Sequence, residues 1–172
     1  INLQNAFGDA SRIREVLYSR ICAEYVPTMR TAFARVTING RYWGLYGMAQ
    51  QFNTDFLRDA FGSRKGVRWK VLRNSGGVGA LRYLGAEPGK YGSYIAKCPA
   101  KDEPDARRRL IELCRVLDTT PAGDLATSSL PKLLDIDGAL WFLALENVFL
   151  DTDGYVRQGY DYRLVEDRHG RF

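Results

Sequence analysis

The spacing of apolar residues predicts a helix and then a β-hairpin in the first third of the chain. Apolar residues recur at helical spacing over residues 9–24, and Asp9 or Ser11 can cap the start of this helix. Its buried face would consist of Ile13, Val16, Leu17 and Ile21. Apolar and polar residues then alternate over residues 31–50, around Asn39-Gly40. That dipeptide suits a type I′ turn, in which both central residues need positive φ.

Shorter patterns predict the remaining elements. They are a helix over 54–61 ended by Gly62, a strand over 66–73 carrying Lys70, a short strand over 90–97 ending at Lys97, a helix over 105–117 and a helix over 134–150. The last helix is apolar nearly all round, so we expect it to be central and buried. Together these elements predict one α+β domain over residues 1–172, an antiparallel hairpin sheet packed with helices.

Composition narrows the classes of function. The 172 residues are 45% hydrophobic and 26% charged, which is typical of a folded domain, and no apolar run is long enough for a membrane helix. The net charge of +5 weakly favours anionic partners. Nucleic-acid binding is not expected, because no basic stripe with interleaved aromatic residues is present. We interpret the one basic cluster, Arg107-Arg108-Arg109, as a solvated helix face.

Cysteine and histidine give no catalytic or metal motif. Cys22, Cys98 and Cys114 are far apart and odd in number, which argues against a disulfide framework or a zinc site. Cys22 and Cys114 fall on apolar helix faces and are expected in the core. The single histidine, His169, is expected in a turn.

A glycine-rich segment, NSGGVGALRYLG, covers residues 74–85. Such a segment can present backbone N–H groups to a phosphate. Its spacing matches neither G-x-G-x-x-G nor a P-loop, so a flexible surface turn is the simpler interpretation.

Three carboxylates gather after the apolar helix, in FLDTDGYVRQGYDYRLV. Asp151 and Asp153 lie near a helix C-terminus, where the macrodipole disfavours anions by about 0.3–1 kcal/mol each. Either these side chains face water and cap local turns, or they bind a cation or accept a proton in a reaction. Phosphoryl transfer fits the second alternative, with Asp153 as base, Asp161 as Mg²⁺ ligand and Lys70 or Lys97 as phosphate lysine. The H-R-D-x-x-x-x-N spacing of ordinary protein kinases is absent.

Several motifs, in order along nearly the whole chain, resemble one known family. They are INLQNAFGDASRIREVL, VPTMRTAFARVTINGRYWGLYGMAQQFNTDFLRDAFG, VRWK and LDIDGALWFLALENVFLDTDGYVRQGYDYRLVEDRHGRF. The chain resembles the spore-coat-protein-H (CotH) kinase family of atypical secreted or cell-surface kinases. The resemblance implies an atypical kinase-like fold and transfer of phosphate from ATP, with Mg²⁺, to Ser or Thr of a protein substrate.

The resemblance also assigns residues. It implies Asp153 as catalytic aspartate, Asp161 as metal ligand, and Lys70, with Lys97 as second choice, as the phosphate-binding lysine. Gln50 stands where many members have Glu, so the usual Lys–Glu pair is not expected. Asp161 replaces the commoner Asn. The resemblance further implies a segment truncated at both ends, with a second metal-binding Asp expected beyond Phe172.

Two functions therefore remain open from the sequence. The first is a kinase domain segment, incomplete by itself. The second is a catalytically inactive relative that serves as a surface or coat interaction module.

Overall fold

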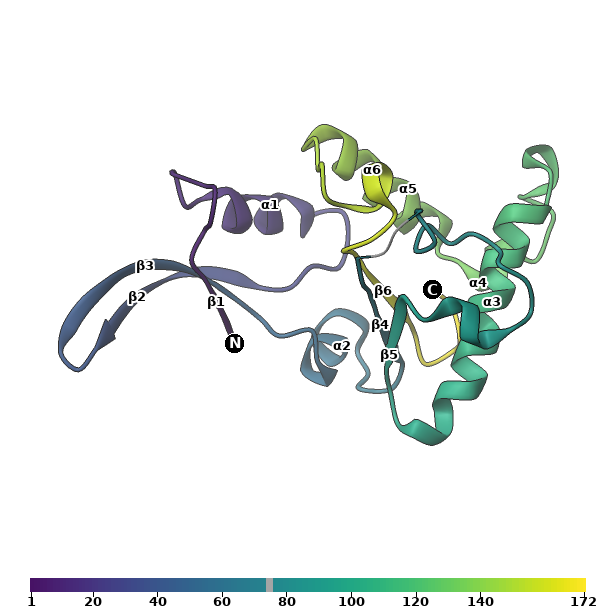
Figure 1. The fold of residues 1–172 in the computed structure, drawn as a ribbon, viewed down its shortest axis with the longest axis horizontal. Helices are drawn as coiled ribbons and strands as arrows, with labels where there is room; N and C mark the ends of the chain where they lie inside the picture. Colours follow the sequence, from purple (N-terminus) through teal and green to yellow (C-terminus); the bar gives the residue numbers. More distant parts are fainter. Residues whose placement is uncertain (74–75) are drawn as a thin grey trace. The chain divides into compact units, whose positions relative to one another are not determined.

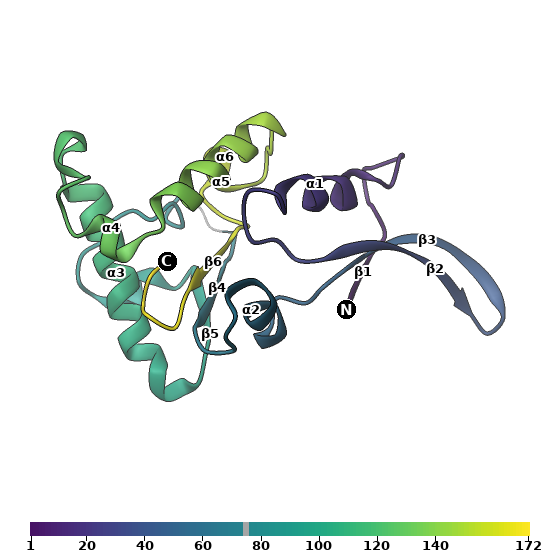
Figure 2. The same cartoon turned by 180° about the vertical axis from the view of Figure 1, so that it is seen from behind.

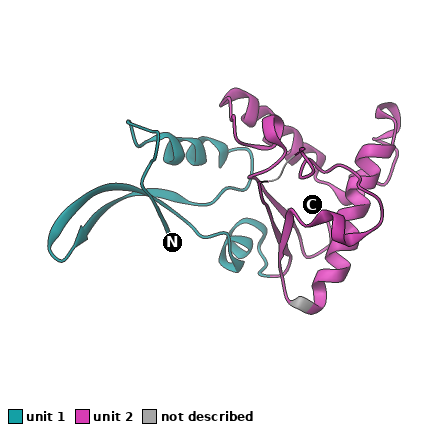
Figure 3. Cartoon of the chain, in the orientation of Figure 1, with its two compact units in different colours: residues 1–64 teal, residues 65–172 magenta. Residues whose placement is uncertain are grey.

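A computed structural model describes residues 1–73 and 76–172 of the chain (Figure 1). The chain forms two compact units, residues 1–64 and 65–172, which Figure 3 colours separately. Each unit combines helices with a three-stranded antiparallel sheet. This combination confirms the predicted α+β class.

The first unit is a hairpin sheet with two helices. Its elements are β1 (Asn2–Gln4), α1 (Arg14–Cys22), β2 (Thr31–Ile38), β3 (Arg41–Ala49) and α2 (Thr54–Phe61). The sheet order is β1-β3-β2, and α1 lies along β2 and β3, as Figures 1 and 2 show from opposite sides. Asn39 and Gly40 have φ angles of 50° and 76°, which confirms the predicted turn. The predicted helix at 54–61 is also confirmed, with Gly62 in the left-handed conformation at its end.

Helix α1 is shorter and more exposed than the sequence predicts. It begins at Arg14 because Arg12 has a φ of 60°, which is not helical. Asp9 organises the preceding turn, and its carboxylate accepts a hydrogen bond from the Arg14 backbone N–H at 3.0 Å. The expected buried face was wrong, since Ile13 and Leu17 stay 47% and 48% exposed. The helix packs on β2 and β3, which cover part of its surface.

The second unit surrounds its sheet with helices. The strands are β4 (Val67–Val71), β5 (Tyr94–Lys97) and β6 (Arg163–Glu166), in the order β5-β4-β6. The helices are α3 (Glu103–Thr119), α4 (Leu130–Leu133), α5 (Ile136–Val148) and α6 (Tyr155–Gln158), with 3-10 turns η1 (Pro88–Tyr91), η2 (Ala100–Asp102) and η3 (Ala122–Asp124). Trp69 and Tyr94 of the sheet are fully buried with Leu110 and Leu113 of α3. The predicted strand carrying Lys70 is confirmed, whereas the one predicted over 90–97 begins only at Tyr94, because η1 occupies Pro88–Tyr91.

The apolar helix α5 is not central, contrary to expectation. Leu140 is 60% and Val148 74% exposed, whereas Leu145 and Glu146 are buried. Helix α5 therefore has apolar residues on all sides, but the rest of the unit packs against only one side of it. The buried acidic residue of α5 is Glu146, which the sequence pattern did not indicate.

The arginine triplet on α3 is not a solvated face either. The Arg107 guanidinium donates hydrogen bonds of 3.0 and 3.1 Å to the backbone carbonyls of Tyr91 and Tyr94. Arg109 forms an ion pair with the buried Glu166. Only Arg108 among the three matches the expectation, with 71% of its side chain exposed. Arg107 and Arg109 turn inward because backbone carbonyls and a carboxylate from distant segments of the chain lie next to α3 and bind them.

Tyrosine hydroxyls hold the glycine-rich segment against the core. Tyr162 donates to the Gly79 carbonyl at 2.6 Å, and the Leu81 N–H donates to the Tyr94 hydroxyl at 2.8 Å. The Leu84 N–H donates to the Tyr91 hydroxyl at 2.9 Å. Asn74 and Ser75, the first two residues of the predicted turn, lie outside the described residues. The described remainder of the segment is bonded to the core and is not a free surface turn.

Smaller expectations are also answered. Cys22 and Cys114 are 1% and 0% exposed, which confirms them as core residues. His169 lies in a turn, as predicted, and its backbone N–H donates to the Asp167 carboxylate. Within residues 1–73 and 76–172, no helix is long and apolar enough to cross a membrane.

Candidate functional site

The two candidate phosphate lysines lie on one face of the β5-β4-β6 sheet. Lys70 of β4 pairs with Ile95 of β5, and Lys97 follows Ile95 by two residues. Because side chains alternate along a strand, Lys70, Ile95 and Lys97 point to the same side of the sheet. Trp69 and Tyr94, on the opposite side, are in the core. The sequence treated the two lysines as alternatives, but strand register makes them neighbours on the outward face.

Two arginines extend this basic face. Lys70 pairs with Arg163 of β6, and Arg68 pairs with Lys97. Four cationic side chains from three strands therefore alternate to the same side of one small sheet. Such a grouping raises the local potential and favours an anionic ligand.

Asp161 lies beside the end of the Lys70 strand. Its backbone N–H donates to the Val71 carbonyl at 3.0 Å, so it is next to the residue that follows Lys70. Its φ of 56° is left-handed, a conformation that Asp adopts more readily than most residues. The side chain is exposed. The structure thus brings Asp161 and Lys70 to neighbouring positions, which their separation in the sequence did not indicate.

Asp153 lies on a different segment, in the loop between α5 and α6. It is exposed, and its backbone N–H donates to the Asp151 carboxylate at 3.0 Å. Asp151 therefore caps a local turn, which is one of the two alternatives that the sequence left open for these carboxylates. No group of three His, Cys, Asp or Glu side chains able to hold a metal ion occurs among the residues that the structure describes.

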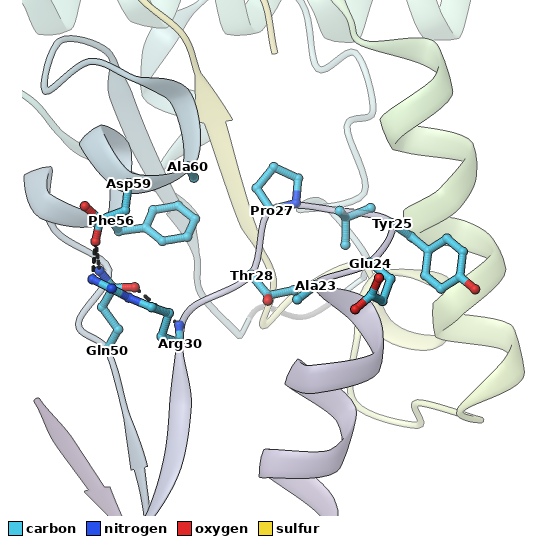
Figure 4. A pocket seen from close by; sticks show the side chains of 11 residues that line it. Ala23, Glu24, Tyr25, Pro27, Thr28, Arg30, Gln50, Phe56, Asp59 and Ala60 are labelled. Carbon is cyan, nitrogen blue, oxygen red and sulfur yellow. Dashed lines mark hydrogen bonds and ion pairs between the residues drawn. The ribbon is translucent and has the colours of Figure 1, made fainter.

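Gln50 belongs to the other unit, residues 1–64, and lines a pocket of about 490 Å³ there (Figure 4). Its side-chain oxygen accepts from the Arg30 N–H at 3.3 Å, and its amide nitrogen donates to Asp59 at 3.1 Å. Arg30 also forms an ion pair with Asp59. Hydrogen bonds from Arg58 and from Gln50, with the charge of Arg30, lower the pKa of Asp59. Gln50 is thus part of a polar network on one wall of the pocket.

The sequence missed Glu146, a buried acid beneath the Asp153 loop. Its side chain is only 4% exposed and its carboxylate accepts from the Val156 N–H at 3.3 Å. Burial raises the pKa of Glu146, and the nearby Asp151 carboxylate adds to the increase. The signal available in the sequence was a single acidic residue within the apolar run LWFLALENVFL.

Comparison with known proteins identifies the family. A family model described as CotH kinase protein matches residues 1–172, which is the whole chain. No curated protein matches the chain at a significant level. The family match includes the basic face of the second unit, Asp161 and the loop with Asp153. On this match, the chain belongs to the CotH kinase protein family.

Proposed function

We propose that this chain transfers the γ-phosphoryl group of ATP, with Mg²⁺, to a Ser or Thr hydroxyl of a protein substrate. The observation that carries the proposal is the CotH kinase match over residues 1–172, which contains every candidate site residue. The match runs through both compact units, so we propose further that the two units are parts of one kinase-like domain.

Each candidate residue has a role in the proposed reaction. Asp153, exposed on its loop, accepts the proton of the attacking hydroxyl. Lys70 and Lys97 bind the phosphates through the basic face, and Gln50 is the remaining candidate for binding the nucleotide. All of these are roles in positioning and electrostatics, which dominate catalysis of phosphoryl transfer.

Asp161 is the proposed Mg²⁺ ligand. Mg²⁺ in nucleotide sites is commonly held by one or two carboxylates together with phosphates and water. An exposed carboxylate beside a basic face that attracts phosphate supplies such a donor. When bound, the ion would neutralise charge on the phosphates.

A second candidate function is an inactive interaction module of a cell surface or spore coat. Gln50 favours it, because glutamine cannot form the ion pair that a glutamate would make with a lysine, and its amide bonds Arg30 and Asp59. For either function we propose a secreted or cell-surface location, by family membership.

Transfer and nucleotide binding in the full-length protein test the proposal. With labelled ATP, Mg²⁺ and a Ser/Thr-containing protein, we expect transfer by the wild type and a loss of about 10²-fold or more in Asp153→Asn. The control is Asp137→Asn, which removes an exposed carboxylate from α5. ATP with Mg²⁺ should also raise the melting temperature. Absence of both transfer and stabilisation in the wild type would contradict the kinase function and favour the interaction module.

The basic face is tested separately. Lys70→Met and Lys97→Met should each weaken ATP binding, measured by titration calorimetry, because both side chains lie on one face. Lys65→Met, which removes a lysine outside the three strands, is the control. Unchanged affinity in both strand variants would exclude this face as the phosphate site.

A further inference from the structure

Glu146 accepts hydrogen bonds from backbone N–H groups on both sides of Asp153. Its backbone carbonyl accepts a hydrogen bond from the Asp151 N–H at 3.0 Å, where α5 ends. Its carboxylate accepts from the Val156 N–H at 3.3 Å, where α6 begins. Asp153 lies between these two attachments, and its own N–H is bonded to Asp151 at 3.0 Å. The bond at Asp151 is a main-chain bond that any residue at position 146 could make, whereas the bond at Val156 requires the Glu146 carboxyl group.

Gly154 shows how close this contact is. A β-carbon built on Gly154 would lie 2.4 Å from Oε2 and 2.6 Å from Oε1 of Glu146. The φ of Gly154 is −97°, which any residue can adopt, so the turn itself does not require glycine. The Glu146 carboxyl group occupies the space that a side chain at Gly154 would need, so a larger residue there would have to displace it.

Burying the Glu146 side chain costs free energy, and packing alone gives no reason for an ionisable residue at this position. An ionisable side chain only 4% exposed on an apolar helix is disfavoured unless its polar atoms are paired. An apolar residue of similar size would fill the same space without this cost. The buried carboxyl group of Glu146 accepts a hydrogen bond from the Val156 N–H and lies against Gly154, so its burial serves to hold this part of the loop.

We propose that Glu146 is a positioning residue for phosphoryl transfer, whose carboxyl group sets the place of Asp153 by fixing the backbone at Gly154–Val156. The inference rests on the proposed function, in which Asp153 is the base. Proton acceptance by Asp153 needs a defined distance to the hydroxyl, and misplacement by about 1 Å can reduce the rate about 10²-fold. Glu146 itself touches neither nucleotide nor substrate in this mechanism.

The experiment separates positioning from stability with two substitutions in the full-length protein. Glu146→Leu keeps the volume and removes the acceptor, whereas Glu146→Gln keeps an oxygen for the Val156 N–H. We expect kcat to fall about tenfold or more in Glu146→Leu with the KM for ATP changed less than about twofold, and Glu146→Gln to stay close to wild type. The melting temperature of Glu146→Leu should not fall, because a buried acid is replaced by an apolar side chain. Asn147→Leu, at the next and exposed position, is the control.

A second variant covers the case in which Glu146→Leu does not fold. Gly154→Ala keeps Glu146 and should lower kcat, because the added methyl group displaces the Glu146 carboxyl group from the Val156 N–H. Amide hydrogen exchange at Val156 should become faster in this variant.

The outcomes are distinguishable. Transfer by Glu146→Leu equal to wild type, or transfer by Gly154→Ala equal to wild type despite faster exchange at Val156, overturns the positioning role and leaves the kinase function intact. No transfer by the wild type overturns both. A fall in kcat that follows melting temperature across all variants shows a structural role only and overturns the inference.

Discussion

Arg109 of α3 and Glu166 of β6 form an ion pair across 57 residues of sequence, and Glu166 is only 1% exposed. Burial raises the pKa of Glu166 and the pairing with Arg109 opposes the rise. The pair joins the longest helix of the second unit to its sheet. Removing Arg109 would therefore leave a buried carboxylate without its cation.

We expect Arg109→Ala to lower the free energy of unfolding by about 2 kcal/mol, less than for a fully buried pair because the Arg109 side chain is 40% exposed. Arg108→Ala, at the adjacent and exposed position, should change it by less than about 0.5 kcal/mol. Urea unfolding of both variants measures the difference. Equal effects would show that the Arg109 pair contributes no more than a surface pair.

The stability of the protein should depend on pH through Glu146. Its pKa in the folded state is raised by burial above the unfolded value of about 4.3, so the folded state holds more protons than the unfolded state between the two values. The contribution of Glu146 to unfolding free energy therefore falls as pH rises through this window. Glu146→Gln does not titrate, so its stability relative to wild type should increase with pH from about 4.3 to the folded pKa and then level off.

Glu112 provides a control of opposite sign for the pH experiment. Hydrogen bonds from Arg115 lower the pKa of Glu112, so its contribution is lost as pH falls. Glu112→Gln should lose stability relative to wild type as pH rises through that lower range. Urea unfolding at several pH values measures both slopes, and slopes of the same sign would contradict the two assignments.

Gly66 should not tolerate a side chain. Its φ is +141°, and a β-carbon there would lie 2.6 Å from the backbone carbonyl oxygen of Glu166. We expect Gly66→Ala to cost about 3 kcal/mol, because the backbones of β4 and β6 must separate. Gly123→Ala, where no atom lies within 4 Å of the added carbon, should be near neutral. Thermal unfolding measures both, and a neutral Gly66→Ala would be inconsistent with the observed strand approach.

The tyrosine contacts of the glycine-rich segment can be tested one by one. Tyr162→Phe removes the donor to the Gly79 carbonyl, so we expect a loss of about 1–2 kcal/mol. Amide exchange at Leu81, whose N–H donates to Tyr94, should also become faster if the segment loosens. Tyr42→Phe, on an exposed strand position, is the control. No change in either measurement would show that the hydroxyl does not hold the segment.

Local sequence was sufficient for several elements. The Asn39-Gly40 turn, the helix closed by Gly62 and the strand bearing Lys70 agree with the structure, and the strand ending at Lys97 agrees from Tyr94 onward. Each depends on backbone preferences encoded within a few residues, such as positive φ at Asn-Gly or glycine after a helix. These preferences act in the same way whatever the rest of the chain does.

The candidate site needed more than local pattern. Lys70 and Lys97 were alternatives in the sequence, and only the register of β4 against β5 places them on one face. Asp161 lies beside the end of the Lys70 strand because its backbone N–H bonds to the Val71 carbonyl. Register between strands is set by contacts distant in sequence, so the sequence of a single strand could not supply it.

What the sequence determined by itself was the family, the secondary-structure elements with local signals and the identity of the candidate acids and lysines. What only the tertiary structure decided was burial and partnership: that Arg107 and Arg109 are bonded inward, that α5 is half exposed, and that Glu146 lies against Gly154. The physical reason is that backbone conformation follows from neighbours along the chain, whereas burial depends on which distant elements pack together.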